Sequence, residues 1–414
     1  MPIPDRKLLE HMTVLELTES QAGATCTQTL AWMGANVIKV EPVNTGEPGC
    51  QQGKESQRKQ QSKAGDVSDD SVFFFLHNTS KKSVSLNMQH AEGKDLFAEL
   101  VAKADGVVNN LAPGNFERLD WSYELLQDVN PSIIYATISG FGAEGPYSEY
   151  PATEIVAEAL GGGFGTTGFP DNPPTVPWNN AGESGAGLHA TMAILAAFAD
   201  HIDTGRSHHV DVSLQDSVMH LIRTRLWVTY HTDRAYPRNG NRLATVPGGT
   251  YPCAPGGPND YVFVFVHYNI PAMWDGCLRA MGREDLIGDE RYRETRARLE
   301  RREEVEKMFT DWTMSKNKYE VFEALGREGV PCGAVLDKAD LTENEHFNMH
   351  DMMVELEHPT RGPMKVLGCP IQVSDGPITF EPAPQLGADN QDVYGGMLGL
   401  DAERLQAMRE DGVI

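Results

Sequence analysis

The alternation of strand-type and helix-type segments in the first third of the chain restricts its fold more than any other feature. The run VLEL is followed by AGATCTQTLAWMGA, which has a helical pattern, and then by the strand-type run NVIKVE. A second unit repeats this order, with HAEGKDLFAELVAKA before GVVNNL and a further helical segment before IIYATISGF. Short strands joined by single helices are typical of parallel strand pairing. The pattern predicts an α/β fold in which a Rossmann-like parallel sheet is flanked by helices.

The remaining sequence predicts a smaller α+β lobe and then a return to the first lobe. A helix over 185–201 and the strand HHVDVSL complete the first lobe, with His208 and His209 expected at the edge of a strand. YVFVFV, NIPAMWDGCLRAMG and the charged helical segment ERYRETRARLERREEVEKMFTDWTM indicate the second lobe, and Gly248 and Gly249 indicate a turn. The expected division is a large domain over 1–218, a linker over 219–242, a small domain over 243–335, and a segment over 336–414 that packs back on the large domain.

Composition limits the partners and the cellular compartment. With 59 acidic and 35 basic residues the formal net charge is −24, which argues against nucleic acid because phosphate backbones need a basic face. The six cysteines form no CxxC pair, so neither zinc nor disulfide bonds are expected, and a reducing cytoplasm fits. No apolar signal core or bilayer-spanning run occurs, which indicates a soluble protein without a membrane partner. The polar stretch Gly46–Ser71 is expected to form an exposed loop, or alternatively a partner contact.

Three groups of motifs, in a fixed order, carry a resemblance to a known family. They are TESQAGATCTQTLAWMGANVIKVEP, then HNTSKKSVSLNM with NNLAPGNFERLDW, and then ATEIVAEALGGGFGTTGFPDNPPTVPWNNAGESGAGLH. With the TGR turn, VDVSLQDSV and GVPCGAV downstream, they resemble class III coenzyme A-transferases such as formyl-CoA transferase and carnitine CoA-transferase. The resemblance covers most of the chain. It implies that residues 1–218 form a coenzyme A-binding domain and that two chains form an intertwined dimer.

The resemblance also implies which residues contact the substrate. In the family a Gln-Ala-Gly loop lies beside the thioester, which makes Gln21 a candidate catalytic residue and Ala22 a candidate coenzyme A contact. The segments similar to the nucleotide-binding groove of the family supply further candidate contacts, which are Met88, Asn110, Pro113, Gly114 and Arg118. No tightly bound cofactor and no metal are implied, and coenzyme A or an acyl-CoA is the expected substrate.

Glu183 is the candidate nucleophile. In the family an Asp after Gly attacks the thioester, and Glu183 holds the corresponding position at the start of the predicted helix. Backbone N–H groups and the helix dipole stabilise negative charge there, although the same position suits an ordinary helix cap. Glu154 matches a second acidic position of the family near the site, and it equally suits a cap. The extra methylene of Glu moves the carboxylate by about 1.5 Å, a displacement that can cost about a hundredfold in rate.

Two further departures from the family concern its ligands. In formyl-CoA transferase, basic residues follow segments like KIE and LDM, whereas Pro42 and Gln89 stand at these positions here. The four-glycine loop of that enzyme is absent, and the nearest run is Pro247, Gly248 and Gly249. The first departure predicts weaker phosphate contacts, and the second argues against a formyl and oxalate substrate pair.

Three functions follow from the resemblance. The first is transfer of coenzyme A from a succinyl-CoA-type donor to an organic acid, through anhydride and glutamyl thioester intermediates, by a homodimer or a heterodimer with a paralogue. The second is a catalytically silent subunit, as in heteromeric relatives such as succinyl-CoA:benzylsuccinate CoA-transferase, which the replacement by Glu183 favours. The third is an acyl-CoA racemase or isomerase. That branch needs an acid/base pair, and GFGAEGPY lacks the expected His.

Overall fold

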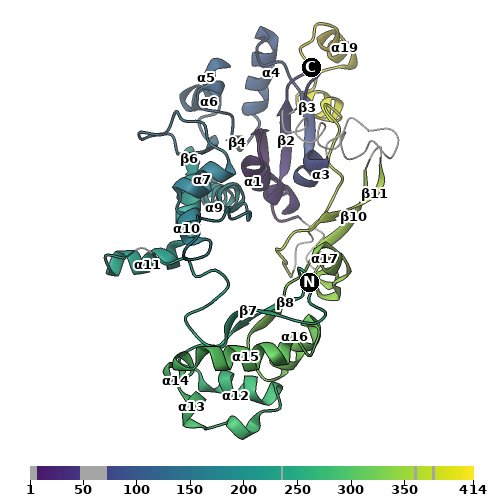
Figure 1. The fold of residues 1–414 in the computed structure, drawn as a ribbon. Helices are drawn as coiled ribbons and strands as arrows, with labels where there is room; N and C mark the ends of the chain where they lie inside the picture. Colours follow the sequence, from purple (N-terminus) through teal and green to yellow (C-terminus); the bar gives the residue numbers. More distant parts are fainter. Residues whose placement is uncertain (1–6, 47–71, 235, 359–360, 375–377) are drawn as a thin grey trace. The chain divides into compact units, whose positions relative to one another are not determined.

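The chain divides into two units (Figure 1). The computed structural model describes residues 7–46, 72–234, 236–358, 361–374 and 378–414. The large unit comprises Met1–Thr166, Val176–Tyr236 and Met349–Ile414, and the small unit comprises Thr167–Thr175 and Pro237–Asn348. Apart from Gly46, the stretch for which the sequence predicts an exposed loop lies outside the described residues. In the described part of the chain, no helix is long and apolar enough to cross a membrane.

A six-stranded parallel sheet forms the centre of the large unit, as the sequence predicts. Its order is β3-β2-β1-β4-β5-β6, and every neighbouring pair is parallel. The strands are β1 Thr13–Leu17, β2 Asn36–Glu41, β3 Lys82–Ser85, β4 Gly106–Asn109, β5 Ile134–Ser139 and β6 His208–Ser213. This order is that of doubly wound dinucleotide-binding folds, in which the strands beside β1 run outward in both directions. His208 and His209 are the first two residues of β6, which confirms their predicted position at the edge of a strand.

Helices cover both faces of this sheet, which explains the nearly continuous apolar runs of its strands. Successive residues of β1 point to opposite faces, so Leu15 packs in one core with Phe97 and Tyr394, while Val14 packs in the other core with Ala186. The helices of the large unit are α1 Gln21–Trp32, α3 Val72–His77, α4 Ala91–Val101, α5 Asn115–Arg118, α6 Tyr123–Val129, α7 Glu154–Leu160, α8 Gly163–Thr166, α9 Ala181–Thr204, α10 Leu214–Leu221, α11 Arg223–His231, the π-helix Gln391–Met397 and α19 Ala402–Glu410.

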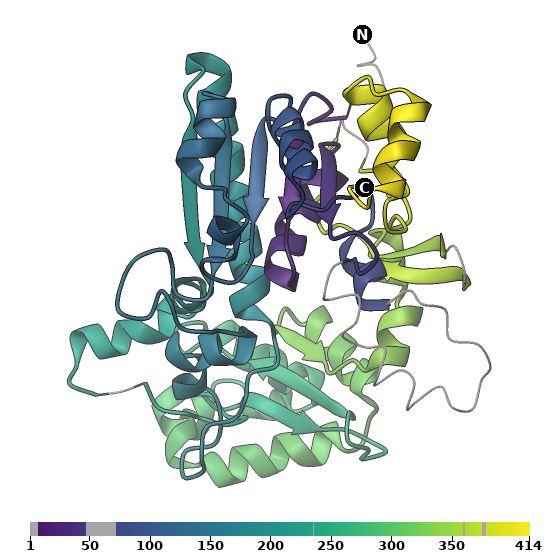
Figure 2. The same cartoon turned by 90° about the horizontal axis from the view of Figure 1, so that it is seen from above.

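The C-terminal segment packs beside the edge of the sheet formed by β3 (Figure 2). The Asp389 carboxylate accepts a hydrogen bond from the Ser83 backbone N–H at 2.8 Å, and the Asn390 side chain accepts one from Ser85 at 3.0 Å. The backbone N–H of Asn87 donates to the carbonyl of Val413 at 2.8 Å. The same part of the chain contains the antiparallel hairpin β10 Met353–His358 and β11 Gly362–Leu367. An otherwise open sheet edge is therefore covered by residues about three hundred positions later in the chain.

Two helices of the large unit approach closely at glycine. A Cβ at Gly187 in α9 would lie 2.5 Å from the carbonyl oxygen of Ala22 and 2.8 Å from Cβ of Thr25, both in α1. Real Cβ atoms do not come this close to other heavy atoms, so no larger residue fits without moving one helix. The contact fixes the first turns of α1 and α9 relative to each other.

We therefore expect Gly187→Ala to destabilise the protein by about 1–3 kcal/mol, because overpacking forces the two helices apart. Activity should fall further than stability, since an ångström-scale shift between these helices displaces groups at their N-termini. Urea unfolding and transferase assays measure the two effects. Gly165→Ala in α8 is the matched control, because a Cβ there meets nothing within 4 Å. Equal behaviour of the two variants would contradict the expectation.

The small unit is α+β, as predicted, and has its own core. Its sheet has the order β7-β8-β9 with antiparallel pairs, and Trp274 and Phe309 are buried against it. Its elements are β7 Gly248–Pro252, β8 Tyr261–Phe265, α12 Pro271–Ala280, the 3-10 helix Glu284–Leu286, α13 Glu290–Arg293, α14 Thr295–Glu300, α15 Arg302–Thr313, α16 Lys318–Arg327, β9 Cys332–Ala334, α17 Lys338–Glu343 and α18 Glu345–Met349. The last helix ends at the boundary of the unit.

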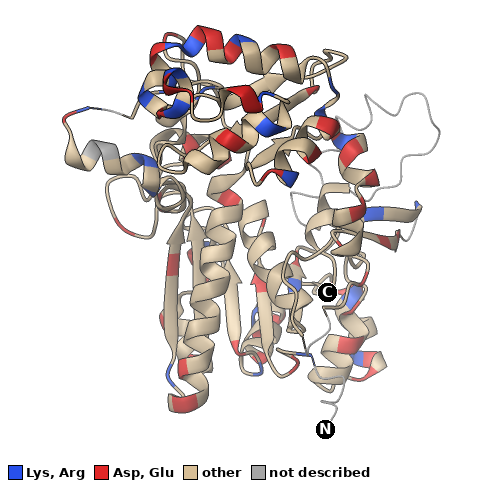
Figure 3. Cartoon of the chain, turned by 90° about the horizontal axis from the view of Figure 1, so that it is seen from below, with Lys and Arg blue, Asp and Glu red and all other residues tan. Residues whose placement is uncertain are grey.

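Two features of this unit differ in detail from the sequence analysis. The turn predicted at Gly248 and Gly249 is wrong, because both residues pair with β8, and a Cβ at Gly249 would lie 2.1 Å from the carbonyl oxygen of Asn241. The charged segment is helical as predicted but is interrupted at Glu294 and Arg301. Figure 3 shows acidic and basic residues interspersed along its helices. Pairs such as Arg302–Glu306 and Lys307–Asp311, four residues apart, are typical of a solvated helix face.

Candidate active site

Glu183 lies in the first turn of the long helix α9, as the sequence predicts. The helix begins four residues earlier than expected, and its N-cap residue Asn180 has a left-handed backbone with φ 52°. Asn tolerates this conformation better than most residues, which allows the chain to turn sharply into the helix. The predicted boundary at residue 185 was too late because AGES contains no large apolar residue that marks a helical face. The Glu183 carboxyl group therefore belongs to a helix N-terminus.

The N-termini of two further helices face this carboxyl group. The backbone N–H groups of Gln21 and Ala22, which open α1, and of Glu154, which opens α7, all act on the Glu183 side chain. These N–H groups have no partner within their own helices, so they are available to an anion. Burial and the nearby Glu154 carboxylate nevertheless raise the pKa of Glu183 above its ordinary value, and the N–H groups oppose this rise. The result is a basic carboxylate held by backbone donors.

Glu154 caps the helix that carries Glu183. Its Oε1 accepts a hydrogen bond from the Gly182 N–H at 3.1 Å, and its Oε2 accepts one from the Glu183 N–H at 2.5 Å. The Glu154 carboxyl group thus lies at the first turn of α9, which bears Glu183, and the Glu183 carboxyl group lies at the first turn of α7, which bears Glu154. Glu154 therefore caps α9 and not α7, the helix whose own cap the sequence suggested, and it lies beside the candidate nucleophile.

The Gln21 side chain joins the start of α1 to the start of α9. Its Nε2 donates to the Ser184 hydroxyl at 2.8 Å, and its Oε1 accepts from the Asn180 amide at 3.0 Å. The residue before it, Ser20, donates to the Asn110 side chain at 2.6 Å. The structure therefore brings Gln21, Glu154 and Glu183 together, although Gln21 precedes the two glutamates by well over a hundred residues in the sequence.

Sequence reasoning missed a third glutamate in this cluster. Glu158 lies one turn after Glu154 on α7, is 1% exposed, and acts on the Glu154 carboxyl group. Burial and Glu154 raise the pKa of Glu158 above its ordinary value. The spacing of four residues was the available signal, because it puts both side chains on one helix face.

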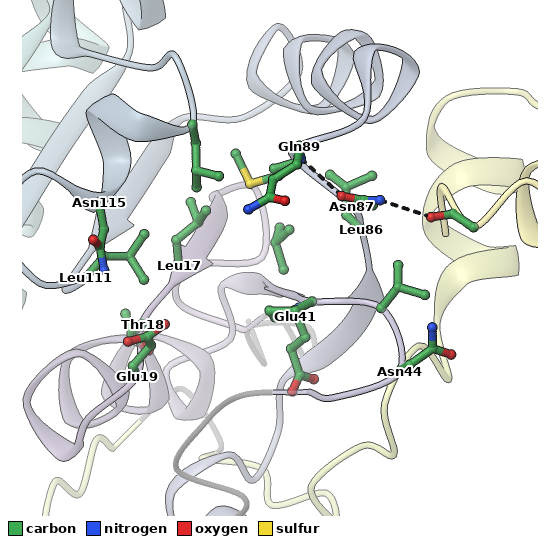
Figure 4. A pocket seen from close by; sticks show the side chains of 16 residues that line it. Leu17, Thr18, Glu19, Glu41, Asn44, Leu86, Asn87, Gln89, Leu111 and Asn115 are labelled. Atoms are coloured by element: carbon green, nitrogen blue, oxygen red, sulfur yellow. Dashed lines mark hydrogen bonds between the residues drawn. The ribbon is translucent and has the colours of Figure 1, made fainter.

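A cavity of about 450 Å³ lies at the carboxyl ends of β1, β2 and β3 (Figure 4). Its lining includes Thr18 and Glu19 after β1, Glu41 and Asn44 at the end of β2, Asn87, Met88 and Gln89 after β3, and Asn115 on α5. In doubly wound sheets, ligands bind in the crevice outside the carboxyl ends of the strands. The loop from β1 to α1 connects this cavity with the catalytic candidates, since Ser20 alone separates Glu19 from Gln21.

The predicted coenzyme A contacts occupy different places around this cavity. Met88 lines it, and Ala22 lies in the first turn of α1. Asn110 is held by Ser20 and donates to the carbonyl of Ile138 at 2.9 Å. Pro113 and Gly114 instead line a neighbouring cavity of about 300 Å³ at the ends of β4, β5 and β6. Arg118 is exposed and donates to Asn115, which lines the larger cavity, at 2.6 Å.

The lining of the larger cavity is neutral or acidic. It contains Glu19 and Glu41, and no Lys or Arg among the described residues. Pro42 and Gln89, which replace basic residues of formyl-CoA transferase, are both part of the lining. Arg118 is an exposed cation that the described structure places next to the cavity through a hydrogen-bonded neighbour.

A buried ion cluster, also missed by the sequence analysis, lies beneath the β1 end of the cavity. Glu16 is 0% exposed and pairs with Lys39 at 2.9 Å. Lys81 donates to Glu16 Oε1 at 3.2 Å and lies 2.9 Å from Oε2, without hydrogen-bond geometry at the second oxygen. Lys39 also donates to the carbonyl of Thr18, which lines the cavity. The cluster fixes the end of β1 from below.

Comparisons with known proteins agree with this arrangement. A family model described as CoA-transferase family III matches residues 9–390. The formyl-CoA:oxalate CoA-transferase of Streptomyces avermitilis is 37% identical, covering 99% of this chain and 100% of the relative. The enzyme of the same name from Bradyrhizobium sp. is 32% identical, covering 99% of this chain and 97% of the relative.

Solved structures show the same fold. A CAIB/BAIF family protein from Brucella suis gives a TM-score of 0.79 at 25% identity, covering 94% of this chain and 98% of its own. A hypothetical protein from Mycobacterium tuberculosis gives 0.76 at 23% identity, covering 93% of this chain and 98% of its own. The order of the sequence motifs, the doubly wound sheet and the match over nearly the whole chain lead to one assignment. The chain belongs to CoA-transferase family III and is a CoA-transferase that acts on CoA thioesters.

Proposed function

We propose that this chain transfers coenzyme A from an acyl-CoA donor of the succinyl-CoA type to an organic acid, with Glu183 as the nucleophile. One observation carries the proposal: the Glu183 carboxyl group meets backbone N–H groups of α1 and α7 at the N-terminus of its own helix. Those N–H groups stabilise the carboxylate before attack. Backbone donors are also what a transferase needs, because negative charge develops on the carbonyl oxygen when a thioester is attacked.

The reaction proceeds through four acyl transfers without net proton movement. A carboxylate oxygen of Glu183 attacks the thioester carbonyl carbon, the C–S bond breaks, and a mixed anhydride and the coenzyme A thiolate result. The thiolate attacks the Glu183 carbonyl carbon and releases the donor acid, which leaves a glutamyl thioester. The acceptor carboxylate attacks this thioester, releases the thiolate and forms a second anhydride. The thiolate then attacks the acceptor carbonyl carbon and frees the Glu183 carboxylate.

The extra methylene of Glu does not prevent this role. Gln21 ties the start of α1 to Ser184, and Glu154 ties the start of α7 to the Glu183 N–H, so the donors follow the helix that carries the longer side chain. The alternative of a silent subunit is favoured by the replacement of Asp at this position and by a carboxyl group whose pKa is raised.

Trapping distinguishes the two functions. The purified chain is incubated with succinyl-CoA and then hydroxylamine, which converts a glutamyl thioester into a hydroxamate that mass spectrometry finds at position 183. A hydroxamate at Glu183 is the expected result. No adduct with the chain alone, but adduct and turnover with a co-produced paralogue, would establish the silent subunit.

The donor and the acceptor are tested separately. The relatives named above are formyl-CoA:oxalate CoA-transferases, whereas this chain lacks the four-glycine loop that its resemblance to formyl-CoA transferase would imply. Initial rates with succinyl-CoA and with formyl-CoA, each against oxalate and longer organic acids, are expected to favour succinyl-CoA. A higher kcat/KM for formyl-CoA with oxalate would replace the proposed donor and leave the role of Glu183 intact.

We expect Arg118→Gln to raise the KM for the acyl-CoA donor about tenfold with little change in kcat. Arg118 is held beside the larger cavity by Asn115, and a charge-assisted contact with a phosphate is worth about 1.5–3 kcal/mol. The matched control is Arg293→Gln, an exposed Arg of the small unit. An unchanged KM would remove Arg118 from the proposed coenzyme A site.

We also propose that the protein is a dimer, with an identical chain or a paralogue. Three helices of the large unit carry large exposed apolar side chains, which are Leu188 and Met192 on α9, Met219 and Leu221 on α10, and Trp227 and Tyr230 on α11. Such side chains are typical of a surface covered by another chain. Light scattering of the purified chain is expected to give twice the mass of one chain, and a monomer at micromolar concentration would contradict the homodimer.

We further propose a cytoplasmic location, because the five described cysteines are free thiols.

A further inference from the structure

Glu158 is a buried acid that the reaction above does not use. Its side chain is 1% exposed, and its Oε1 receives no hydrogen bond from any residue that the structure describes. An ionised carboxylate in this environment would leave an oxygen without a donor, which is strongly unfavourable. A protonated carboxyl group avoids this because it is neutral and its O–H is itself a donor.

The surroundings of Glu158 fix where that proton points. Its Oε2 lies against α8, since a Cβ at Gly163 would come within 1.9 Å of this oxygen. The backbone N–H of Ala181, in the first turn of α9, also acts on the carboxyl group. The side chain hydrogen-bonded to it is that of Glu154, one turn earlier on α7. A proton on Glu158 is therefore placed to reach the Glu154 carboxylate.

The remaining titratable groups around Glu158 do not compete for this role. Helix α8 has no titratable residue, and Asp216 and His220 on α10 are exposed. From α9, Glu183 acts on the pair through Glu154. The three carboxyl groups thus form a chain from Glu158 through Glu154 to Glu183.

We propose that Glu158 is a positioning residue that keeps a proton and donates it in a hydrogen bond to Glu154, which holds the cap of α9 and thereby orients Glu183. Burial, and then the Glu154 carboxylate, raise the pKa of Glu158, in agreement with this role. The inference rests on the proposed function, because an oriented Glu183 matters only if that residue attacks a thioester.

Two variants distinguish three possible roles of Glu158: a protonated hydrogen-bond donor, an ionised carboxylate, and a side chain that only fills space. Glu158→Gln keeps a hydrogen-bond donor in its amide. We therefore expect no shift in the acid limb of the plot of kcat/KM against pH, which is the part where activity falls as the pH is lowered. Glu158→Met removes the donor, so the charge of the Glu154 carboxylate acts more strongly on Glu183 and raises its pKa further, and the acid limb should move up by about one pH unit. We also expect kcat to fall about tenfold or more in the Met variant, with KM unchanged.

Each other outcome overturns the inference. If Glu158 is ionised, both variants remove a negative charge and the acid limb moves down in both. If Glu158 only fills space, both variants keep the wild-type pH profile and differ only in melting temperature. Glu99→Gln, an exposed acid on α4 of the same unit, controls for the loss of a distant charge.

An infrared measurement tests the proton without relying on turnover. The full-length protein in heavy water at neutral pH should show the carbonyl stretch of a protonated carboxylic acid, which ionised carboxylates lack. Glu158→Gln should lose this band and Glu183→Gln should keep it. If the wild type lacks the band, Glu158 is not protonated and the inference is wrong. If the band is present in a chain without transfer activity, only the proposed function is contradicted.

Discussion

Glu183→Gln is expected to abolish coenzyme A transfer, with a fall in kcat of at least about a thousandfold. The amide is nearly the same size as the carboxylate, but it cannot attack a thioester or form the anhydride. The backbone N–H groups of Gln21 and Ala22 remain able to meet the amide oxygen, so the fold should be unchanged. Isotope exchange between labelled succinate and succinyl-CoA measures this partial reaction directly.

Asp203→Asn is the matched control, because Asp203 is an exposed acid near the other end of the same helix. It should exchange label at the wild-type rate. Glu183→Asp provides a second comparison, since it shortens the side chain by one methylene. We expect it to retain about a hundredth of the wild-type rate or more, because the attacking group survives and only its distance changes. Full exchange by Glu183→Gln would refute the nucleophile.

The sheet of the large unit is predictable from sequence because its strongest strands are apolar runs separated by helical segments. The runs VLEL, NVIKVE and IIYATISGF correspond to β1, β2 and β5. β3 has the sequence KSVS and was not predicted, because four partly polar residues carry little periodic signal. Its edge is completed by Asp389 and Asn390, and no local pattern reveals a partner about three hundred residues away.

The candidate site was predictable only through the resemblance. No periodicity distinguishes Glu183 from an ordinary acid in a first helical turn, and a lone Gln such as Gln21 carries no chemical signal. The N-termini of α1, α7 and α9 come together at the site, and no local sequence pattern predicts this. It depends on the close approach of α1 and α9 at Gly187. The roles of Gln21, Glu154 and Glu183 in catalysis remain predictions.

The missed residues share one cause, which is that charged side chains are expected at the surface. The sequence pattern predicts that Glu158 lies on the solvent-facing side of a short helix. It also predicts that Lys39 occupies an exposed polar position of a strand with alternating polarity. Their burial arises from other elements of the fold, such as α8 and α9 around Glu158. Buried charges of this kind are found only after the layers of the fold are known.

The cluster around Glu16 should dominate stability toward acid. Burial raises the pKa of Glu16, but Lys39 and Lys81 outweigh this and lower it from 4.5 to about 2. Because the folded pKa is depressed, the stabilisation is fully present above about pH 4.5 and is lost as the pH falls toward 2. A shift of this size corresponds to about 3 kcal/mol.

Glu16→Gln should therefore destabilise the protein at neutral pH by about 3–5 kcal/mol, because two lysines remain buried beside a neutral amide. The urea midpoint, measured from pH 7 to pH 3, should fall steeply for the wild type below pH 4.5, with a shallower fall for the variant. Glu99→Gln, an exposed acid on α4, should match the wild type throughout. Donor KM should also rise in the Glu16 variant, since Lys39 loses its main partner and no longer fixes Thr18 at the cavity. A variant that unfolds at the wild-type urea concentration would show that the lysines are neutralised by other means.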